Sequence, residues 1–151
     1  MTAFDLDGTI CNAWWDTENY PNALKSWERM DKCPKCLHIV CKYLINATPL
    51  ILPINSPIII TARPEILRDV TEEWLCVERI NFLVLHMSVE IVNGNKERAI
   101  TKSKIIKNLG IKRYVEDEEE IMIMLKNLCL DVEFLKPVEA VNMGLARYSE
   151  N

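Results

Sequence analysis

Short apolar segments alternate with longer stretches of helical character along the whole chain. Five apolar segments predict strands, and they are TAFDL (2–6), PIIIT (57–61), NFLVLH (81–86), KRYVED (112–117) and LDVEFL (130–135). Strands that alternate with helices are typical of βαβ units, because two parallel strands need a long crossover between them. The order of the segments therefore predicts an α/β fold: a three-layer, Rossmann-like arrangement with a central parallel sheet.

Five helices are predicted around these strands, over residues 21–30, 34–47, 64–75, 101–110 and 118–128. In the third helix, Ile66, Val70 and Trp74 recur at four-residue intervals and are expected to share one face. Gly110 suits the left-handed position beyond the end of the fourth helix. The segment 88–98 stays ambiguous, because its Asn-Gly pair indicates a turn that could belong to a small hairpin.

The length of 151 residues suits one domain, so we expect a single domain over 1–151. The longest apolar segment, 49–60, contains three prolines and is far shorter than a membrane span, so no membrane partner is expected. The start of the chain has no basic region followed by an apolar core, and a cytoplasmic location is expected. The net charge of −4 opposes a surface that binds nucleic acid over its whole extent.

The first predicted strand ends in FDLDGT, which places Asp5 and Asp7 one residue apart. Side chains alternate along a strand, so the two carboxylates would point the same way if the strand continued. Carboxylates this close repel, and one or both would bind a proton unless a cation lies between them. The pair therefore indicates a metal ion, a proton-transfer role or both, while the alternative is a polar Asp-Gly loop.

Polar residues also follow two other predicted strands. PIIIT ends in Thr61 with Arg63 two residues further on, and KRYV is followed by Glu116 and Asp117. Ligands of open α/β sheets bind beyond the carboxyl ends of the strands, which is where these residues and Asp5 would meet. Carboxylates from two strands suit Mg²⁺, whereas a hydroxyl and a cation suit phosphate.

Four segments resemble, in order, the four motifs of the haloacid dehalogenase (HAD) superfamily of phosphotransferases: FDLDGT, IIITAR, TKSKII and YVEDE. The resemblance spans roughly residues 3 to 120. It implies an Mg²⁺-dependent phosphatase, because members that hydrolyse phosphate usually have an aspartate at the second acidic position of the first motif. About 50 residues separate the first two motifs, which implies a minimal cap, with residues 12–56 as a flap or small helical insertion.

The resemblance implies a role for each acid. Asp5 would attack phosphorus and become a transient aspartyl phosphate, and Asp7 would protonate the leaving oxygen and then activate water. The Mg²⁺ ligands would be Asp5, the backbone carbonyl of Asp7 and an acid of the fourth motif. That acid is best matched to Asp117, with Glu116 as the alternative, because this motif reads Glu116-Asp117-Glu118.

The other motif residues are implied to act on the phosphate. Thr61 would hydrogen-bond the transferring phosphoryl group. Lys102, expected near the start of its helix, would offset the charge of Asp5 and phosphate, with Lys104 as the alternative lysine. The residues implied to bind substrate phosphate are Gly8, Thr9 and Arg63.

The TAR triplet and the helix after it look like the phosphatase half of polynucleotide kinase–phosphatases. This likeness implies a nucleotide or a nucleic-acid 3′-end phosphate as substrate and partner. The alternatives are a phosphatase of other small phosphorylated metabolites, and a module that binds metal and phosphate with little catalysis. A homodimer stays open as a way to close the site. Trp14 and Trp15 belong either to a substrate-side flap or to the domain surface.

The segment KCPKCLHIVC contains three of the six cysteines. Nothing marks the chain as secreted, so all six are expected to be free thiols. Cys33, Cys36, His38 and Cys41 also suggest a zinc site, which is the alternative. No second cysteine pair follows at finger-like spacing, and Cys33 and Cys41 share a helical face with apolar neighbours. Packing of cysteine as a small apolar residue is therefore the favoured interpretation.

Overall fold

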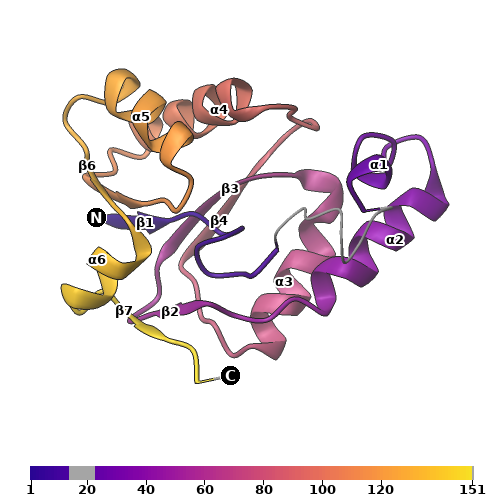
Figure 1. Ribbon diagram of the computed structural model, residues 1–151, viewed down its shortest axis with the longest axis horizontal. Coiled ribbons are helices and arrows are strands. Elements are labelled where there is room, and N and C mark those ends of the chain that lie inside the picture. Colours follow the sequence, from indigo (N-terminus) through magenta and orange to yellow (C-terminus); the bar gives the residue numbers. More distant parts are fainter. Residues whose placement is uncertain (14–22, 151) are drawn as a thin grey trace.

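The fold is built around a five-stranded parallel sheet (Figure 1). A computed structural model describes residues 1–13 and 23–150. In their order across the sheet, the strands are β4 (Val84–Ser88), β3 (Ile58–Pro64), β1 (Thr2–Phe4), β5 (Arg113–Val115) and β6 (Glu133–Leu135). Every neighbouring pair of these strands is parallel, which confirms the predicted α/β fold with a central parallel sheet.

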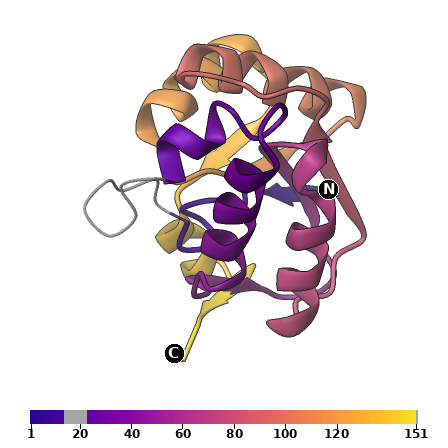
Figure 2. The same cartoon turned by 90° about the vertical axis from the view of Figure 1, so that its right-hand side faces the viewer.

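Helices cover both faces of this sheet and complete three layers (Figures 1 and 2). They are α1 (Ala23–Trp27), α2 (Pro34–Ile45), the 3₁₀ turn η1 (Glu65–Leu67), α3 (Arg68–Val77), α4 (Asn95–Asn108), α5 (Glu119–Leu128) and α6 (Pro137–Asn142). Side chains alternate along a strand, so β3 divides the apolar core in two. Ile59 packs in one core with Leu44 and Trp74, whereas Ile58 and Ile60 pack in the other with residues of α4 and α5. Among the described residues, no helix has both the length and the apolar character needed to span a membrane.

A second, two-stranded sheet pairs β2 (Ile51–Pro53) with β7 (Ala146–Tyr148) in antiparallel fashion. Neither strand is among those predicted from the sequence, because neither segment alternates clearly and the partner of each lies far away in the chain. This sheet fastens the end of the predicted insertion to the C-terminal segment.

Helix α4 begins at Asn95, earlier than predicted. Gly94 precedes it with a φ of 84°, which glycine adopts without steric cost, and no side chain caps the first turn. The segment 88–98 therefore contains a loop and the first turn of α4, and the hairpin alternative is wrong. Lys102 lies in the middle of α4 rather than at its start. Gly110, with a φ of 63°, follows the helix in the left-handed conformation, as predicted.

The predicted helix over 64–75 starts as the 3₁₀ turn η1 before α3 continues it. Val70 and Trp74 are buried, but Ile66 is 42% exposed, so the prediction that the three residues share one face is wrong for Ile66. A 3₁₀ turn has three residues per turn instead of 3.6, which changes the phase of the first residues. Leu67 takes the buried position in place of Ile66.

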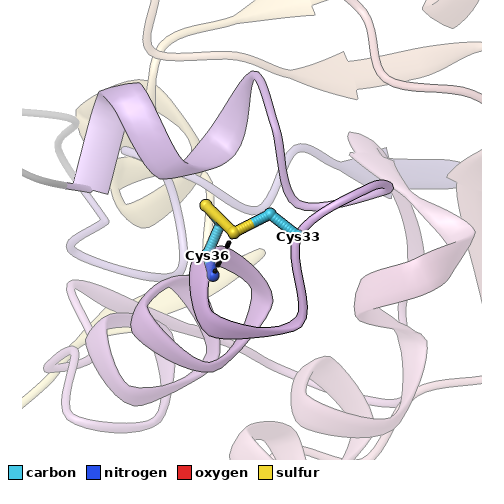
Figure 3. The surroundings of a disulfide bond; sticks show 2 residues. All are labelled: Cys33 and Cys36. Carbon is cyan, nitrogen blue, oxygen red and sulfur yellow. Dashed lines mark hydrogen bonds between the residues drawn. A yellow bond between two sulfur atoms is a disulfide. The ribbon is translucent and has the colours of Figure 1, made fainter.

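Cys33 and Cys36 form a disulfide at the start of α2 (Figure 3). The prediction of a free thiol is wrong for these two residues, and the zinc alternative is incompatible with the disulfide because it needs both sulfurs as thiolates. Cys33 is the N-cap and Cys36 lies in the first turn, where residues three apart are neighbours on the helix surface. The free cysteines of the described residues are Cys11, Cys41, Cys76 and Cys129.

Candidate active site

Strand β1 lies in the middle of the sheet, and later strands are added first on one side of it and then on the other. From β1 the chain passes to β3 on one side, and it later returns to β5 on the other. The crevice at such a switch point is where open α/β sheets bind ligands. Asp5 directly follows β1, Glu116 directly follows β5, and Thr61 is the middle residue of β3. Three neighbouring strands therefore bring polar side chains to one edge of the sheet.

Three carboxylates meet at this edge. Oxygen atoms of Asp5, Glu116 and Asp117 all lie within 4.8 Å of one another. Lys102 lies against two of them, with its Nζ 2.8 Å from Asp5 Oδ1 and 2.7 Å from Glu116 Oε2. Asp5, Glu116 and Lys102 are all buried. One lysine does not neutralise three carboxylates, so the cluster has excess negative charge when all three acids are ionised.

Burial, together with this crowding, raises the pKa of all three carboxyl groups. Burial, and after it the charge of Glu116, raises the pKa of Asp5 to about 8. Burial raises the pKa of Glu116 as well, and burial together with the charge of Asp5 raises the pKa of Asp117 to about 6. Burial lowers the pKa of Lys102, but the charges of Asp5 and Glu116 outweigh it and hold that pKa above its ordinary value. A divalent cation would relieve this repulsion, and clustered carboxylate oxygens are the donors that Mg²⁺ prefers. The donor set therefore fits Mg²⁺.

The turn after β1 contacts the carboxylate of Asp117. The Thr9 hydroxyl donates to Asp117 Oδ1 at 3.1 Å, and the backbone N–H of Gly8 donates to the carbonyl of Cys11 at 2.7 Å. Gly8 has a φ of 83°, and a Cβ built there would lie 2.2 Å from Asp117 Oδ2. A side chain at residue 8 would therefore have to displace the Asp117 carboxylate. In this structure Gly8 and Thr9 both contact protein groups. The contact of Gly8 and Thr9 with substrate phosphate stays a prediction.

Gly8→Ala is expected to lower the free energy of unfolding by about 1–3 kcal/mol, because the new methyl group must displace Asp117. Chemical denaturation measures the loss. Gly144→Ala is the matched control, since Gly144 has a φ of 74° but no atom within 4 Å of a built Cβ. It should show the backbone cost alone. Equal losses in the two variants would mean that Asp117 does not exclude a side chain at Gly8.

Asp7 is not part of the three-acid cluster and pairs with Arg63 instead. Arg63 Nε donates to Asp7 Oδ1 at 3.0 Å and to Oδ2 at 2.9 Å, and Nη2 donates to Oδ1 at 2.5 Å. The Arg63 side chain is 1% exposed and that of Asp7 is 20% exposed. The buried guanidinium therefore fixes the orientation of a carboxylate that solvent still reaches.

The remaining contacts of Arg63 also face the protein. Its Nη1 donates to Thr71 Oγ1 at 3.0 Å, and its Nη2 lies 3.4 Å from Cys11 Sγ. Its backbone N–H donates to Thr61 Oγ1 at 3.2 Å. The pairing of β3 with β4 shifts register across this segment, and such irregularities redirect side chains beside functional sites. The structure directs the guanidinium of Arg63 toward Asp7, and the expected contact of Arg63 with substrate phosphate stays a prediction.

These side chains line a cavity of about 120 Å³. The predicted residues in its lining are Asp5, Asp7, Thr61, Arg63, Lys102, Glu116 and Asp117. Lys104, the alternative lysine, is exposed on α4, so Lys102 is the lysine that lies at the cavity. Trp14 and Trp15 lie outside the described residues.

The cavity lining also includes residues that were not predicted, among them Trp27, Asn95 and Arg98. Arg98 is half-buried, and its Nη1 donates to Asn95 Oδ1 at 3.1 Å. It lies four residues before Lys102 and therefore on the same side of α4. This spacing could have identified Arg98, but the predicted helix began after it. The position of Trp27 depends on how α1 packs, for which the sequence has no signal.

No protein-family model and no curated protein sequence matches the chain. Among solved structures, the fold is similar to a chain of the Pnkp1/Rnl/Hen1 complex, with a TM-score of 0.52, 15% sequence identity, and coverage of 89% of this chain and 44% of that one. A chain of the Pnkp1/Rnl/Hen1 RNA repair complex gives the same TM-score of 0.52 and 15% identity, with 89% and 41% covered. This chain thus spans less than half the length of either neighbour, and the similarity is one of fold.

Proposed function

We propose that the chain is an Mg²⁺-dependent phosphomonoesterase of the HAD type, which acts through an aspartyl phosphate on a nucleotide or a nucleic-acid 3′-end phosphate. The observation that carries this proposal is the meeting of two carboxyl groups, a hydroxyl and a cation at one cavity. They are the nucleophile Asp5, the acid–base group Asp7, the hydroxyl of Thr61 and the cation of Lys102. The similarity in fold to chains of an RNA repair complex supports the proposed class of substrate.

Asp5, Asp117 and the backbone carbonyl of Asp7 would hold the Mg²⁺ ion. Asp117 suits direct ligation better than Glu116, because both oxygens of Glu116 are already hydrogen-bonded. Its Oε2 accepts from Lys102 at 2.7 Å and its Oε1 accepts from the N–H of Glu118 at 3.2 Å. When bound, the ion would neutralise the negative charge that the carboxylates and the phosphate bring together.

In the first displacement, an oxygen of the Asp5 carboxylate attacks phosphorus, and the bond from phosphorus to the leaving oxygen breaks. The Asp7 carboxyl gives its proton to that leaving oxygen. Lys102 orients Asp5 through its hydrogen bond to Oδ1 and leaves the other oxygen for the attack. Thr61 Oγ1 already accepts the N–H of Arg63, so its own O–H is directed elsewhere and donates to the phosphoryl group. The products are an alcohol and an aspartyl phosphate.

In the second displacement, a water oxygen attacks phosphorus and Asp7 accepts the proton of that water. The bond between phosphorus and the Asp5 oxygen breaks, which releases inorganic phosphate and restores the carboxylate. Asp7 then carries the proton needed for the next cycle. Two displacements replace one difficult hydrolysis, which is the usual gain of covalent catalysis.

Phosphate release from a panel of substrates tests this function. The panel contains one oligonucleotide phosphorylated at its 3′ end, the same oligonucleotide phosphorylated at its 5′ end, nucleoside monophosphates, sugar phosphates and p-nitrophenyl phosphate. We expect release with Mg²⁺, fastest from the 3′-phosphorylated oligonucleotide or a mononucleotide. The Asp5→Asn protein, purified in parallel, controls for contaminating phosphatases. A protein that binds Mg²⁺ but releases phosphate from no substrate would be a binding module, and the proposal would fail.

Removal of Mg²⁺ with excess EDTA is expected to abolish turnover, and added Mg²⁺ is expected to restore it. A binding measurement is independent of activity: Mg²⁺ should raise the melting temperature of the wild-type protein, because an ion bound only to the native state stabilises it. The Asp117→Asn variant should show a much smaller rise. Turnover that continues undiminished in EDTA would contradict the metal assignment.

We further propose that Arg98, rather than Arg63, meets the anionic part of the substrate beyond the reacting phosphoryl group. Arg98 lines the cavity, and among the described residues no carboxylate forms a salt bridge with it. Arg63, in contrast, is occupied by Asp7 and Thr71. A guanidinium at the cavity edge suits a neighbouring phosphodiester of a nucleic-acid end.

Arg98→Gln is expected to raise KM for a 3′-phosphorylated oligonucleotide about 10- to 100-fold with a smaller change in kcat, because a charge-assisted hydrogen bond is lost. For p-nitrophenyl phosphate, which has no second phosphate, KM should change little. Lys104→Gln is the matched control, since it removes an exposed charge from the same helix. Equal KM effects of Arg98→Gln on both substrates would contradict this role.

A further inference from the structure

The disulfide lies where a helix stabilises a thiolate. Cys33 is the N-cap of α2, a helix of 12 residues, and its Sγ accepts a hydrogen bond from the backbone N–H of Cys36 at 3.2 Å (Figure 3). The first turn of α2 contains no acidic residue. The positive end of the helix dipole and this N–H would both favour a negatively charged sulfur at Cys33. Cys33 is therefore the better leaving group of the two.

The same disulfide is expected to contribute little to the stability of the fold. Its cysteines are only three positions apart, so the loop it closes restricts the unfolded chain little. Both residues are half-buried, which leaves them within reach of small solutes. A reachable Cys-X-X-Cys disulfide at a helix start has the features of a redox-active pair.

A basic hollow lies beside Cys36. Its volume is about 280 Å³, and its lining is Lys25, Ser26, Arg29, Lys35, Cys36 and Ile39. Three of these six side chains are cations and none is an acid. The acids nearest in sequence, Glu28 and Asp31, are outside this lining. Helices α1 and α2, which lie side by side, supply most of the hollow (Figure 1). It is complementary in charge to a small molecule with carboxylate groups.

We propose that Cys33 and Cys36 form a redox site that exchanges with low-molecular-weight thiols bearing carboxylates, which bind in the basic hollow next to Cys36. The proposal is independent of the phosphatase site, because Cys33, Cys36 and the hollow share no lining residue with the cavity at Asp5. Failure of either proposal would therefore leave the other standing.

The exchange has two steps. The thiolate of the incoming molecule attacks Cys36 Sγ, a bond forms between these two sulfurs, and the Cys33–Cys36 bond breaks. Cys33 leaves as the thiolate that the helix start stabilises. A second thiolate then attacks the sulfur of the bound molecule, and Cys36 leaves in turn. One protein disulfide and two thiols give one protein dithiol and one small disulfide, so atoms and electrons balance.

Charge selectivity of the exchange tests the hollow. The oxidised protein is reduced with glutathione, 3-mercaptopropionate or cysteamine, and each rate constant is expressed per thiolate. The two anionic thiols are expected to react at least about tenfold faster than the cationic cysteamine. Arg29→Glu together with Lys35→Glu should remove this preference, whereas Lys107→Glu, an exposed change on α4, should keep it. Equal rates for all three thiols in the wild-type protein would overturn the proposed binding of anionic thiols.

Peptide mapping tests which sulfur is attacked. The reaction with glutathione is stopped early with an alkylating agent, and trypsin then places the two cysteines on separate peptides, because it cleaves after Lys32 and Lys35. We expect glutathione on Cys36 and the alkyl group on Cys33. The reverse pattern would overturn the assigned order. A reduced protein that glutathione disulfide does not oxidise at these two cysteines would overturn the redox site itself.

Discussion

Asp5→Asn is expected to lower phosphomonoesterase turnover by about 10⁴-fold or more while the protein stays folded. The asparagine has no charged oxygen to attack phosphorus, so no aspartyl phosphate forms. Its amide oxygen can still accept the hydrogen bond that Lys102 now donates to Asp5 Oδ1 at 2.8 Å. The substitution also removes one of three crowded carboxylates, so the melting temperature should stay the same or rise. Phosphate release and thermal unfolding measure the two effects.

Trapping of the intermediate separates the role of Asp5 from a role in binding. Wild-type protein quenched in acid during turnover should have a phosphoryl group on the N-terminal peptide, located by mass spectrometry at Asp5. The Asp5→Asn protein should still bind substrate yet remain unmodified, although it should bind Mg²⁺ more weakly because Asp5 is also a proposed ligand of the ion. An Asp5→Asn protein with wild-type turnover would remove the nucleophile from the proposed mechanism.

The central sheet was predictable because each of its strands is a local apolar segment. PIIIT and NFLVLH contain most of β3 and β4, and the three shorter strands fall inside predicted segments as well. Alternation with helices then required parallel pairing, which is the observed arrangement. These features depend on residues that are near one another in the chain, where periodicity is informative.

Features that depend on distant partners were not predictable. Strand β2 pairs with β7 through three residues on each side, and neither segment alternates clearly enough to indicate a strand. The start of α4 was missed for a different reason. Its first turn is polar, and Gly94 offers no side-chain cap, so the usual signs of a helix start are absent.

The site residues divide in the same way, into those that the local sequence predicts and those whose contacts depend on distant parts of the chain. The predicted strand ends alone were enough to bring Asp5, Thr61 and Glu116 to one edge of the sheet, because parallel strands end on the same side. The pairing of Asp7 with Arg63 joins residues 56 positions apart and exists only because β1 and β3 are neighbours. The choice between Lys102 and Lys104 likewise needed the rotation of α4, which no apolar stripe in that helix indicates.

Asp7→Asn is expected to lower turnover by about 10²- to 10⁴-fold, because Asp7 would transfer a proton in both displacements. The same change should destabilise the fold. Arg63 is 1% exposed, and without Asp7 its charge would lie buried with no carboxylate beside it. Loss of one partner of a buried ion pair costs about 3–5 kcal/mol, and the 20% exposure of Asp7 should bring the loss toward the lower figure. Denaturation and kinetic measurements are therefore both needed.

A double variant separates these two consequences. Arg63→Met removes the buried charge and keeps a long apolar side chain, so Asp7→Asn with Arg63→Met should recover most of the lost stability. It should recover none of the lost turnover, because the proton-transfer group is still absent. Turnover that returned together with stability would show that Asp7 acts by maintaining the structure.

A comparison of two leaving groups tests whether the turnover lost in the Asp7→Asn variant is due to lost proton transfer. A ribose oxygen departs poorly without a proton, whereas p-nitrophenolate is stable as an anion and hardly needs one. In single-turnover measurements of the first displacement, Asp7→Asn should therefore lose much more activity on a 3′-phosphorylated oligonucleotide than on p-nitrophenyl phosphate.

Breakdown of the aspartyl phosphate still requires Asp7 to accept a proton from water, so this second displacement becomes the slow step with p-nitrophenyl phosphate. That change should appear as a burst of p-nitrophenol close to one equivalent of protein. Equal losses on the two substrates would contradict the role of Asp7 as the acid, because only proton donation depends on how well the leaving oxygen bears a charge.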